Sequence, residues 1–511
     1  MNKHFETNIR SALNLENQRF LADTRRKKWL WIIIGGLLIT AWQGVFLAQS
    51  DFLASDSQYR QNASSGLHAE GRFVYFYYYL GWYPLATTTD PEDLTYSRDG
   101  AKKALRHPST LRTEMGHTTR YGDLGKVWLY FPHVWIFGFN PEPNLLTANT
   151  AGFIFALITI FSAAVYIERP VLGLVLVVLA GSNPFQLYET YVRHNVFGWP
   201  IIVLLLIIGI QLPLITSYQI TRKQRLLYPV ITGGLLSTVC QIRSEPATII
   251  AGVGVSYLIL NLLKLRSRVL MIITLILAFT LGSIAWSSYF SHKIKQTEAM
   301  LKKIGGTPYN GPRDTRHLIW HPIWCGLGDF DQKYGYKWDD RVPAKLFETF
   351  NQDKKLKRST GAYVYENYWD EKQYYYKTPY EIPGYTQFIK KMILHDITHD
   401  PLWYGQILLR RLKRIATKTS PLRIAMGRHY IQVNFPMYLI LLPVFFLAVL
   451  SKNRLAVVLL ILSLCTSITS FLIFSGKNMT MYSSYHLISA SLAVTWIFEI
   501  FILKSIGKNI K

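Results

Sequence analysis

Residues 25–48 read RRKKWLWIIIGGLLITAWQGVFLA, four cationic residues followed at once by a run long enough to cross a bilayer. A hydrocarbon core about 30 Å thick requires about 20 mainly apolar residues in helical form. Tryptophans near both ends of the run match the aromatic residues that favour the membrane interface. The stretch therefore predicts a transmembrane helix over 29–48, and the basic residues before it predict a cytoplasmic N-terminus.

The same pattern recurs along the chain and predicts about ten membrane helices. Half of the 511 residues are hydrophobic and only 17% are charged, whereas a soluble protein carries about 25% charged residues. Much of the net charge of +25 lies in short connectors beside apolar runs, so we attribute it to membrane topology and not to nucleic-acid binding. The predicted spans cover residues 29–48, 147–167, 170–187, 196–216, 227–243, 246–263, 269–289, 433–450, 455–474 and 484–503.

Alternation of these spans places the short basic connectors and both termini in the cytoplasm. The expected fold is an all-α polytopic membrane protein with two extracytoplasmic caps. Both caps are rich in aromatic residues, and the first is expected to hold short interfacial helices. The predicted segments are a cytoplasmic N-terminal segment (1–28), helix one (29–48), the first cap (49–146), helices two to seven (147–289), the second cap (290–432), helices eight to ten (433–503) and a cytoplasmic tail (504–511).

The first residues of the first cap carry candidate catalytic groups. Asp51 and Asp56 follow the first span, and Tyr59 and Arg60 come shortly after. A carboxylate at the outer end of a helix can act as a general base toward an acceptor, or help to hold a divalent cation. The alternative is a solvated loop carboxylate.

This part of the sequence resembles a known family. The pattern Asp56-x-x-Tyr59-x-x-x-Ala63, followed by Glu70-Gly71-Arg72-Phe73-x-Tyr75, is similar to the segment after the first transmembrane helix of GT-C fold glycosyltransferases. The resemblance is to the dolichyl-phosphate-mannose-type protein mannosyltransferases and their bacterial relatives. Looser similarities are Tyr130-Phe131-Pro132 and Asp400-Pro401-Leu402-Trp403-Tyr404, the latter like a family segment on an interfacial helix.

The resemblance implies a GT-C fold and a polyprenyl-phosphate-linked sugar donor. It implies transfer to a lipid, glycan or protein acceptor at the outer face, among membrane lipids. Asp56 matches the family's catalytic acidic residue, whereas Ser57 stands where many relatives carry a second acidic residue. A divalent metal is therefore a possible cofactor and not an assigned one. Similarity to bacterial relatives, together with the absence of an ER-retention tail, favours the bacterial inner membrane.

Basic residues on the same predicted side are suited to the donor phosphate. Arg243 and Glu245 lie in the connector between the fifth and sixth spans, and a guanidinium there can bind phosphate through two N–H groups. Equally, the two residues can pair with one another. His194, Lys477 and His486 are further candidates for the anionic pocket, with solvated loop groups as the alternative.

The second cap contains two histidine pairs at helical spacing, His317 with His321 and His395 with His399. His395 and His399 resemble the spacing of a zinc protease, but Asp396 is shorter than the required glutamate, so no metal site is assigned. His321 begins the tract 321–340, rich in Trp, Tyr and Gly. Such a tract fits either a carbohydrate-binding surface or a small aromatic core.

Two other functions compete with glycosyl transfer. An oligosaccharide polymerase or ligase of cell-surface polysaccharide also has many spans and one large outer loop. A transporter would need helix breaks or charged groups near the middle of the membrane, and usually an inverted repeat. The sequence shows no such feature, so transport ranks third.

Overall fold

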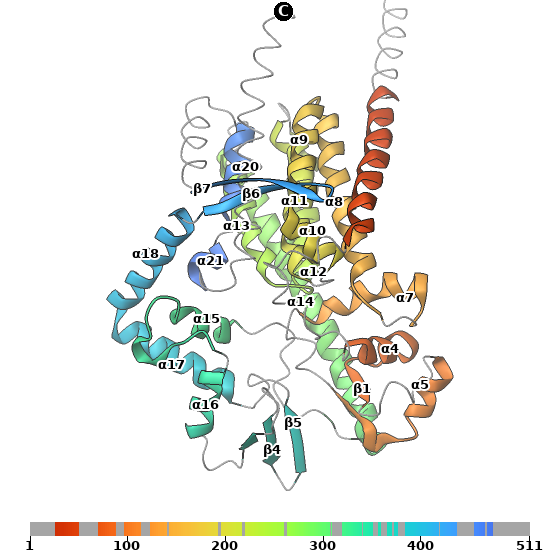
Figure 1. Cartoon of the computed structure of the whole chain (residues 1–511), viewed down its shortest axis with the longest axis vertical. Coiled ribbons are helices and arrows are strands. Elements are labelled where there is room, and N and C mark those ends of the chain that lie inside the picture. The colour runs from red at the N-terminus through yellow and green to blue at the C-terminus, as the bar shows by residue number, and fades with distance from the viewer. Residues whose placement is uncertain are drawn as a thin grey trace, which may run out of the picture.

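The computed structural model of the chain describes a large helical region and parts of both predicted caps (Figure 1). The described residues are 26–50, 70–87, 97–113, 123–139, 143–192, 196–216, 220–259, 263–306, 308, 319–339, 341–350, 356–358, 365–369, 372–376, 384–417, 419–436, 454–465 and 468–473.

The described chain is mostly helical, as expected. The helical region comprises the N-terminal helix Arg26–Ala48, α8 (Leu146–Tyr166), α9 (Pro170–Gly181), α10 (Pro184–Tyr191), α11 (Trp199–Thr216), α12 (Arg222–Val239), α13 (Ile249–Leu258), α14 (Leu265–Lys303), α20 (Arg454–Cys465) and α21 (Ile468–Leu472). Two 3-10 turns, η4 (Val196–Gly198) and η5 (Glu245–Thr248), precede α11 and α13.

Four of the described helices are long and apolar enough to cross a membrane, or five if the bent pair α9–α10 forms one span. The four are Arg26–Ala48, Leu146–Tyr166, Val196–Thr216 and Leu265–Lys303. In the N-terminal helix and α14, most apolar residues are exposed, including Trp31, Leu38 and Leu277. Exposed apolar faces of this length mark a membrane-facing surface. The structure thus supports a membrane protein with four or five candidate spans among the described residues, whereas the sequence predicts about ten.

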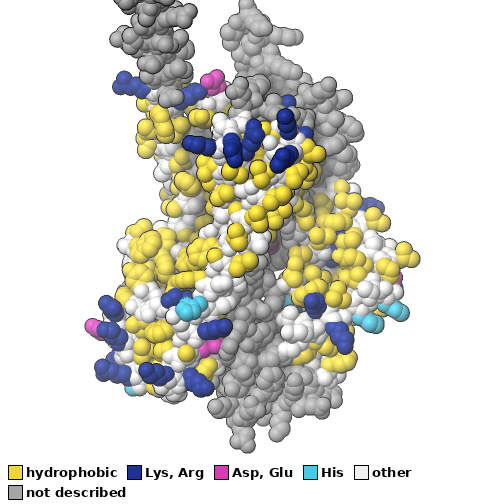
Figure 2. Space-filling model, turned by 180° about the vertical axis from the view of Figure 1, so that it is seen from behind, with side chains coloured by type: hydrophobic (Ala, Val, Ile, Leu, Met, Phe, Trp, Pro, Cys, Tyr) yellow, Lys and Arg dark blue, Asp and Glu magenta, His cyan; other side chains and the backbone are white. Residues whose placement is uncertain are grey.

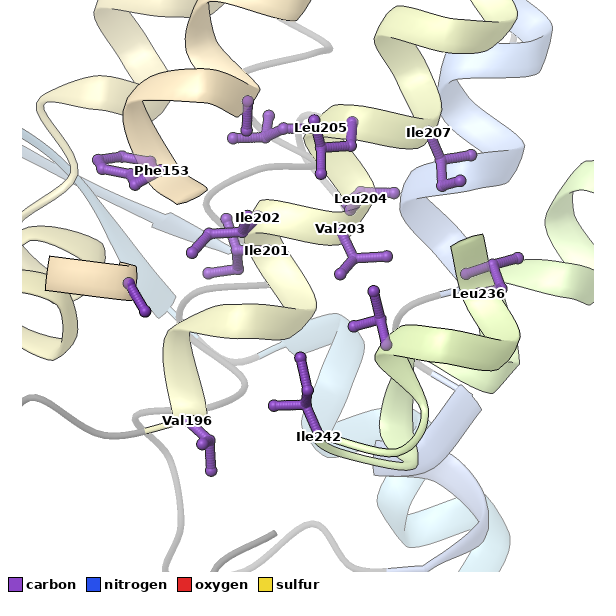
Figure 3. Packing of buried hydrophobic residues seen from close by; sticks show 14 of the residues in the cluster. Phe153, Val196, Ile201, Ile202, Val203, Leu204, Leu205, Ile207, Leu236 and Ile242 are labelled. Carbon is purple, nitrogen blue, oxygen red and sulfur yellow. The ribbon is translucent and has the colours of Figure 1, made fainter. Parts of the chain in front are cut away.

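Helix α11 is the centre of the helical region (Figure 3). Its side chains are buried almost all round, so it packs on α8, α12 and α20. Small residues allow the closest helix contacts. A Cβ on Gly209 would lie 2.8 Å from Thr159 of α8, and one on Gly233 of α12 would lie 2.7 Å from the Leu275 carbonyl of α14. Close approach at small residues is the usual way in which membrane helices associate.

The predicted span 170–187 is not one continuous helix. Helices α9 and α10 meet at a bend of 63°. The Asn183 side chain accepts a hydrogen bond from the Phe185 N–H at 2.9 Å, and Pro184 occupies the first turn of α10. A side-chain cap followed by proline starts a new helix. The expectation that the spans contain no break was therefore wrong.

The first cap continues directly from the membrane helices. Its described elements are α4 (Glu70–Leu80), β1 (Leu85–Thr87), α5 (Arg98–Ala104), η2 (Pro108–Thr110), β2 (Leu111–Thr113), η3 (Leu124–Tyr130) and α7 (Phe131–Phe137). Strands β1 and β2 pair antiparallel. Phe73, Val74, Tyr75 and Phe76 of α4 are fully buried, so this short helix contributes to the core of the protein.

Helix α14 carries the first cap. The predicted seventh span ends at 289, but α14 continues to Lys303, and its 39 residues extend about 58 Å. The polar extension packs against the first cap: the Tyr77 and Tyr289 hydroxyls lie 2.5 Å apart, and the Tyr83 N–H donates to Thr297 at 3.0 Å. The predicted boundary at 289/290 therefore falls inside a helix.

The second cap has a hydrophobic core of its own. It contains α15 (Trp320–Leu327), η6 (Lys333–Gly335), α16 (Arg341–Phe350), β3 (Leu356–Arg358), β4 (Tyr365–Trp369), β5 (Lys372–Tyr376), α17 (Tyr385–His399) and α18 (Pro401–Thr417). Strands β3, β4 and β5 form one antiparallel sheet in that order. Trp324, Tyr336 and Ile389 are among the fully buried residues of this core.

A β-hairpin at the end of the predicted second cap (290–432) lies beside the helical region, and its second strand crosses the predicted boundary at 432/433. Strand β6 (Thr419–Met426) pairs antiparallel with β7 (His429–Pro436) around a two-residue turn that begins at Gly427, whose φ is +57°. The Ala425 N–H donates to the Ser182 carbonyl at 2.7 Å, at the end of α9. The all-α expectation thus needs correction, because seven short strands form three small sheets within the described residues.

The predicted spans near the C-terminus are only partly described. The span 455–474 corresponds to α20 and α21. The first residues of the span 433–450 belong to β7, and its remaining residues, like the span 484–503, lie outside the described residues.

The two ends of the helical region differ in charge. Lys28 donates to Glu168 at 2.8 Å, which joins the start of the N-terminal helix to the connector between α8 and α9. Arg225 donates to Ser267 at 3.1 Å, which joins the start of α12 to the start of α14. Figure 2 shows a row of Lys and Arg side chains across this end, which we call the basic end. Both caps lie at the opposite end, which we call the cap end (Figure 1).

Candidate functional site at the cap end

Most of the sequence-predicted site residues lie outside the described residues. These are Asp51, Asp56, Tyr59, Arg60, His194, Lys477 and His486. Arg243, Glu245 and His321 are described.

The structure fixes where the first acidic segment leaves the membrane helices. The N-terminal helix ends at Ala48, three residues before Asp51. Its buried Gln43 donates to the Gly181 carbonyl at 2.9 Å and accepts from the Tyr191 hydroxyl at 2.9 Å. One amide thus ties the helix to both sides of the α9–α10 bend, and the chain leaves the helix at the cap end.

Arg243 and Glu245 form a two-point ion pair in the connector between α12 and α13. Arg243 Nε donates to Glu245 Oε2, and Nη2 donates to Oε1. Each side chain is only 12% exposed, and the guanidinium carbon lies 4.3 Å from the centre of the Phe197 ring. Of the two alternatives from the sequence, the pairing is therefore what the structure contains. A guanidinium held in this way has a fixed orientation, which phosphate binding also requires.

The first cap covers this connector through backbone hydrogen bonds. The Asp123 N–H donates to the Ile242 carbonyl at 2.9 Å, and the Gly125 N–H donates to the Gln241 carbonyl at 2.8 Å. A Cβ on Gly125 would lie 2.6 Å from the Gln241 Cβ, so glycine permits this approach. The connector is thereby placed under the cap.

Asp123 and Lys126 are buried charged residues that the sequence analysis missed. Both side chains are at most 1% exposed, and both lie in the cap segment that pairs with residues 241–242. Removing a charged side chain from water costs free energy, so a buried charged residue is a candidate for a functional role. The signal was present in the sequence as a charged residue on each side of Leu124-Gly125, within a tract that was otherwise assigned to a loop.

Buried polar side chains continue from the connector into the helices. Trp199 Nε1 donates to Asn149 Oδ1 at 2.8 Å, and Gln186 Nε2 donates to Thr190 Oγ1 at 3.1 Å. Glu189 of α10 is 1% exposed. Because they lie within helices of apolar composition, the sequence analysis did not select them. Such groups near a membrane boundary are expensive and are candidates for function.

His321 belongs to the core of the second cap. It is 9% exposed, and its Nδ1 lies 2.8 Å from the Tyr385 hydroxyl. Trp324 and Tyr336 are fully buried beside each other, with ring centres 4.4 Å apart. The tract that begins at His321 therefore forms the small aromatic core, which was one of its two interpretations.

The His395 and His399 rings stack on the surface of α17, with centres 5.9 Å apart. His395 Nδ1 lies 3.1 Å from Asp396 Oδ1, and Asp396 Oδ2 accepts from the Tyr336 hydroxyl at 2.8 Å. Burial and the neighbouring Asp396 carboxylate raise the pKa of Tyr336. Within the described ranges, no three His, Cys, Asp or Glu side chains converge as metal ligands would.

Comparison with known proteins found no match for this chain among family models, curated proteins or solved structures.

Proposed function

We propose that the protein is a membrane glycosyltransferase of GT-C type, which transfers a sugar from a polyprenyl-phosphate donor to a lipid, glycan or protein acceptor. The observation that carries the proposal is Arg243, held by Glu245 under the first cap at the end of the membrane helices. A lipid-linked phosphate moves within the plane of the bilayer, so its binding site must lie at the membrane boundary. An oriented guanidinium at that level suits a phosphate leaving group.

The proposed chemistry places donor and acceptor under the first cap. The acceptor oxygen or nitrogen attacks the anomeric carbon, and the bond from that carbon to the phosphate oxygen breaks with the electron pair leaving on the phosphate. Asp56 takes the proton from the acceptor. Arg243, assisted by His194 or Lys477, stabilises the charge on the departing phosphate.

The proposed topology has ten crossings with both termini in the cytoplasm. It is supported by the basic end, where the pairs Lys28–Glu168 and Arg225–Ser267 lie away from both caps. Engineered cysteines near Asp90 and Lys354 should react with an impermeant thiol reagent from outside. Cysteines near Lys223 and Lys452 should react only after the cytoplasmic side is opened. A reversed position at either end would contradict an extracytoplasmic site.

Substitution of Arg243 tests the donor site directly. Arg243→Ala should weaken binding of a polyprenyl-phosphate sugar by about tenfold to a hundredfold, since a charge-assisted hydrogen bond contributes about 1.5–3 kcal/mol. Arg243→Lys should recover part of this, because an ammonium does not reproduce the two-point geometry. Binding is measured with purified protein and labelled donor.

Glu245→Gln is the matched control for the ion pair, because it removes the negative charge and keeps the size of the side chain. It should leave donor binding closer to the native value than Arg243→Ala does. If donor affinity is unchanged in both Arg243 variants, the arginine has only its structural role with Glu245.

Transport is a second candidate function, because one observation favours it. The α9–α10 bend, with buried Gln186 and Glu189 beside it, is the kind of broken helix at which transporters bind substrate. Flux of a polyprenyl-phosphate sugar across vesicles that contain the protein but no acceptor would support transport. Sugar transfer in detergent, without a membrane barrier, would support the transferase.

A further inference from the structure

Two apolar surfaces extend sideways from the caps at the level where the helical region ends. The first is the outer side of α7, where Trp135, Ile136 and Phe137 are 67%, 64% and 54% exposed. The second is on α18, where Leu409 and Leu412 are exposed although the helix is otherwise rich in arginine and lysine. Figure 1 shows α7 and α18 on opposite sides of the molecule.

The contacts of α7 set its level relative to the membrane. It packs against α8, whose first residue, Leu146, begins one of the candidate spans. It also follows η3, which lies on the connector between α12 and α13. Three consecutive large apolar side chains are therefore exposed beside the end of a membrane helix. Tryptophan and phenylalanine favour this boundary between acyl chains and headgroups.

The level of α18 is set by Arg411. This residue is fully buried, and its Nη1 donates to the Phe471 carbonyl at 3.2 Å and to the Leu472 carbonyl at 2.8 Å. These carbonyls are at the end of α21, which contacts η5 in the connector beside Arg243. The C-terminal half of α18 consequently lies at the cap end of the helical region.

The exposed surface of α18 combines leucines with cations. At about 100° per residue, Leu409 and Leu412 lie about 60° apart, and the buried Arg411 is about 160° from Leu409 and about 100° from Leu412. Lys413 is exposed next to this stripe, and Arg410 lies beyond it with half of its side chain exposed. An apolar stripe with cations along one border is typical of a helix that binds an anionic membrane surface.

We propose that α7 and the C-terminal half of α18 seat the two caps in the leaflet at the cap end, and that α18 selects acidic phospholipids while α7 binds without regard to headgroup charge. The occupant of both surfaces is the bilayer that the chain crosses. The N-terminal helix and α14, which are candidate membrane spans, likewise expose large apolar side chains, and the cations on α18 supply charge complementary to acidic headgroups. Helix α7 contains no Lys, Arg, Asp or Glu, which accounts for the difference.

Lipid-borne quenchers test the proposal on the full chain. A fluorescent thiol label is placed at Ile136→Cys or Leu409→Cys, with Cys465→Ser as the background and the buried Cys240 and Cys325 retained. In vesicles of brominated phosphatidylcholine, both labels should be strongly quenched. A label at Leu402→Cys is the matched control, because Leu402 is exposed on the same side of α18 but about 13 Å along the helix from Arg411. It should be quenched severalfold less.

Charge selection is measured in mixed vesicles that contain brominated phosphatidylglycerol or brominated phosphatidylcholine. The label at 409 should prefer the acidic lipid about fivefold for each cation in contact, the usual effect of one Lys or Arg near a membrane surface. Lys413→Glu should remove this preference, and the label at 136 should show none. Equal quenching at 402 and 409, or protection of 409 from both lipids and water-soluble quenchers, would contradict the proposed contact between the C-terminal half of α18 and the bilayer. An equal lipid preference at 136 and 409 would contradict the proposal that α18 selects acidic phospholipids and α7 does not.

Discussion

The two caps attach to the membrane helices in different ways. The buried residues of the first cap belong to the same hydrophobic cluster as the membrane helices, so Tyr75, Leu124 and Phe290 lie in one continuous core with α11. The second cap has a separate core around Trp324 and Ile389. Among the described residues, it meets the membrane helices at polar contacts such as Arg411 with the end of α21.

This difference indicates which cap can keep a site at a fixed position relative to the membrane helices. The first cap lies on the connector that carries Arg243, and backbone hydrogen bonds and the α14 extension hold it there. A side chain in that cap therefore keeps its position relative to Arg243, the proposed phosphate-binding residue. The second cap has its own hydrophobic core, and the contact described above between it and the helical region is polar. We therefore expect the chemistry to depend on the first cap, and the stability of the second cap to depend on its polar anchor.

The largest expected effect is on that anchor. Arg411 Nε lies 3.5 Å from Asp329 Oδ2, and both side chains are fully buried. Arg411→Met removes the positive charge and leaves a buried carboxylate, which typically costs about 3–5 kcal/mol. Hydrogen exchange of residues 384–417 should accelerate strongly in this variant, while exchange of residues 124–139 should change little.

Arg410→Met is the control for the Arg411 variant. It is the same substitution one residue earlier, but Arg410 forms a half-exposed ion pair with Asp331 at 3.3 Å. Exposed pairs contribute at most about 1 kcal/mol, so exchange should be nearly native. If Arg411→Met loosens both caps to the same extent, the caps unfold together and the proposed division between them is wrong.

The next largest effect concerns Asp56 and transfer activity. Asp56→Asn keeps the size of the side chain but removes its basicity, so sugar transfer should fall by roughly a hundredfold or more, the usual scale for loss of a general base. Exchange in both caps should stay native. Asp51→Asn is the control and should be mild. Full activity of Asp56→Asn with loss in Asp51→Asn would identify the other carboxylate, and no effect in either would favour a polymerase or ligase.

Much of the helical region could be predicted from the sequence, because burial in a membrane requires long apolar runs. The runs 29–48, 147–167 and 196–216 correspond closely to described helices. The pairing of Arg243 with Glu245 was also foreseen as one of two alternatives, since residues two apart in a turn can meet. Features of this kind depend on residues that are close together in the sequence, so composition and spacing are enough to predict them.

Features that depend on contacts distant in sequence could not be predicted. Arg411 and Asp329 are 82 positions apart, and nothing in either segment identifies the partner. The extension of α14 beyond 289 is polar, so a search for apolar runs stops too early. The α9–α10 bend did have a local signal, because Asn183-Pro184 combines a capping side chain with a proline, but the surrounding apolar residues suggested a continuous span.

The smallest expected effect is a difference between the caps in acid. Arg341 donates hydrogen bonds to Asp339 and lowers the pKa of that carboxyl group to about 2, and Lys333 likewise holds the pKa of Asp400 below its ordinary value. A group whose pKa is lower in the folded state stabilises the fold above its unfolded pKa of about 4. That stabilisation is lost as pH falls through the folded pKa. The second cap should therefore lose stability between about pH 4 and pH 2.

The expected loss from Asp339 is under about 1 kcal/mol, because the pair lies near the surface and solvent screens it. It is measured as faster hydrogen exchange in residues 341–350 and 384–399 as pH is lowered, after correction for intrinsic exchange. Asp339→Asn should flatten this dependence by removing the titrating group. If residues 124–139 lose protection with the same midpoint, acid acts on a single cooperative unit. If they do not, the core of the second cap also unfolds separately, as the two distinct apolar clusters among the described residues imply.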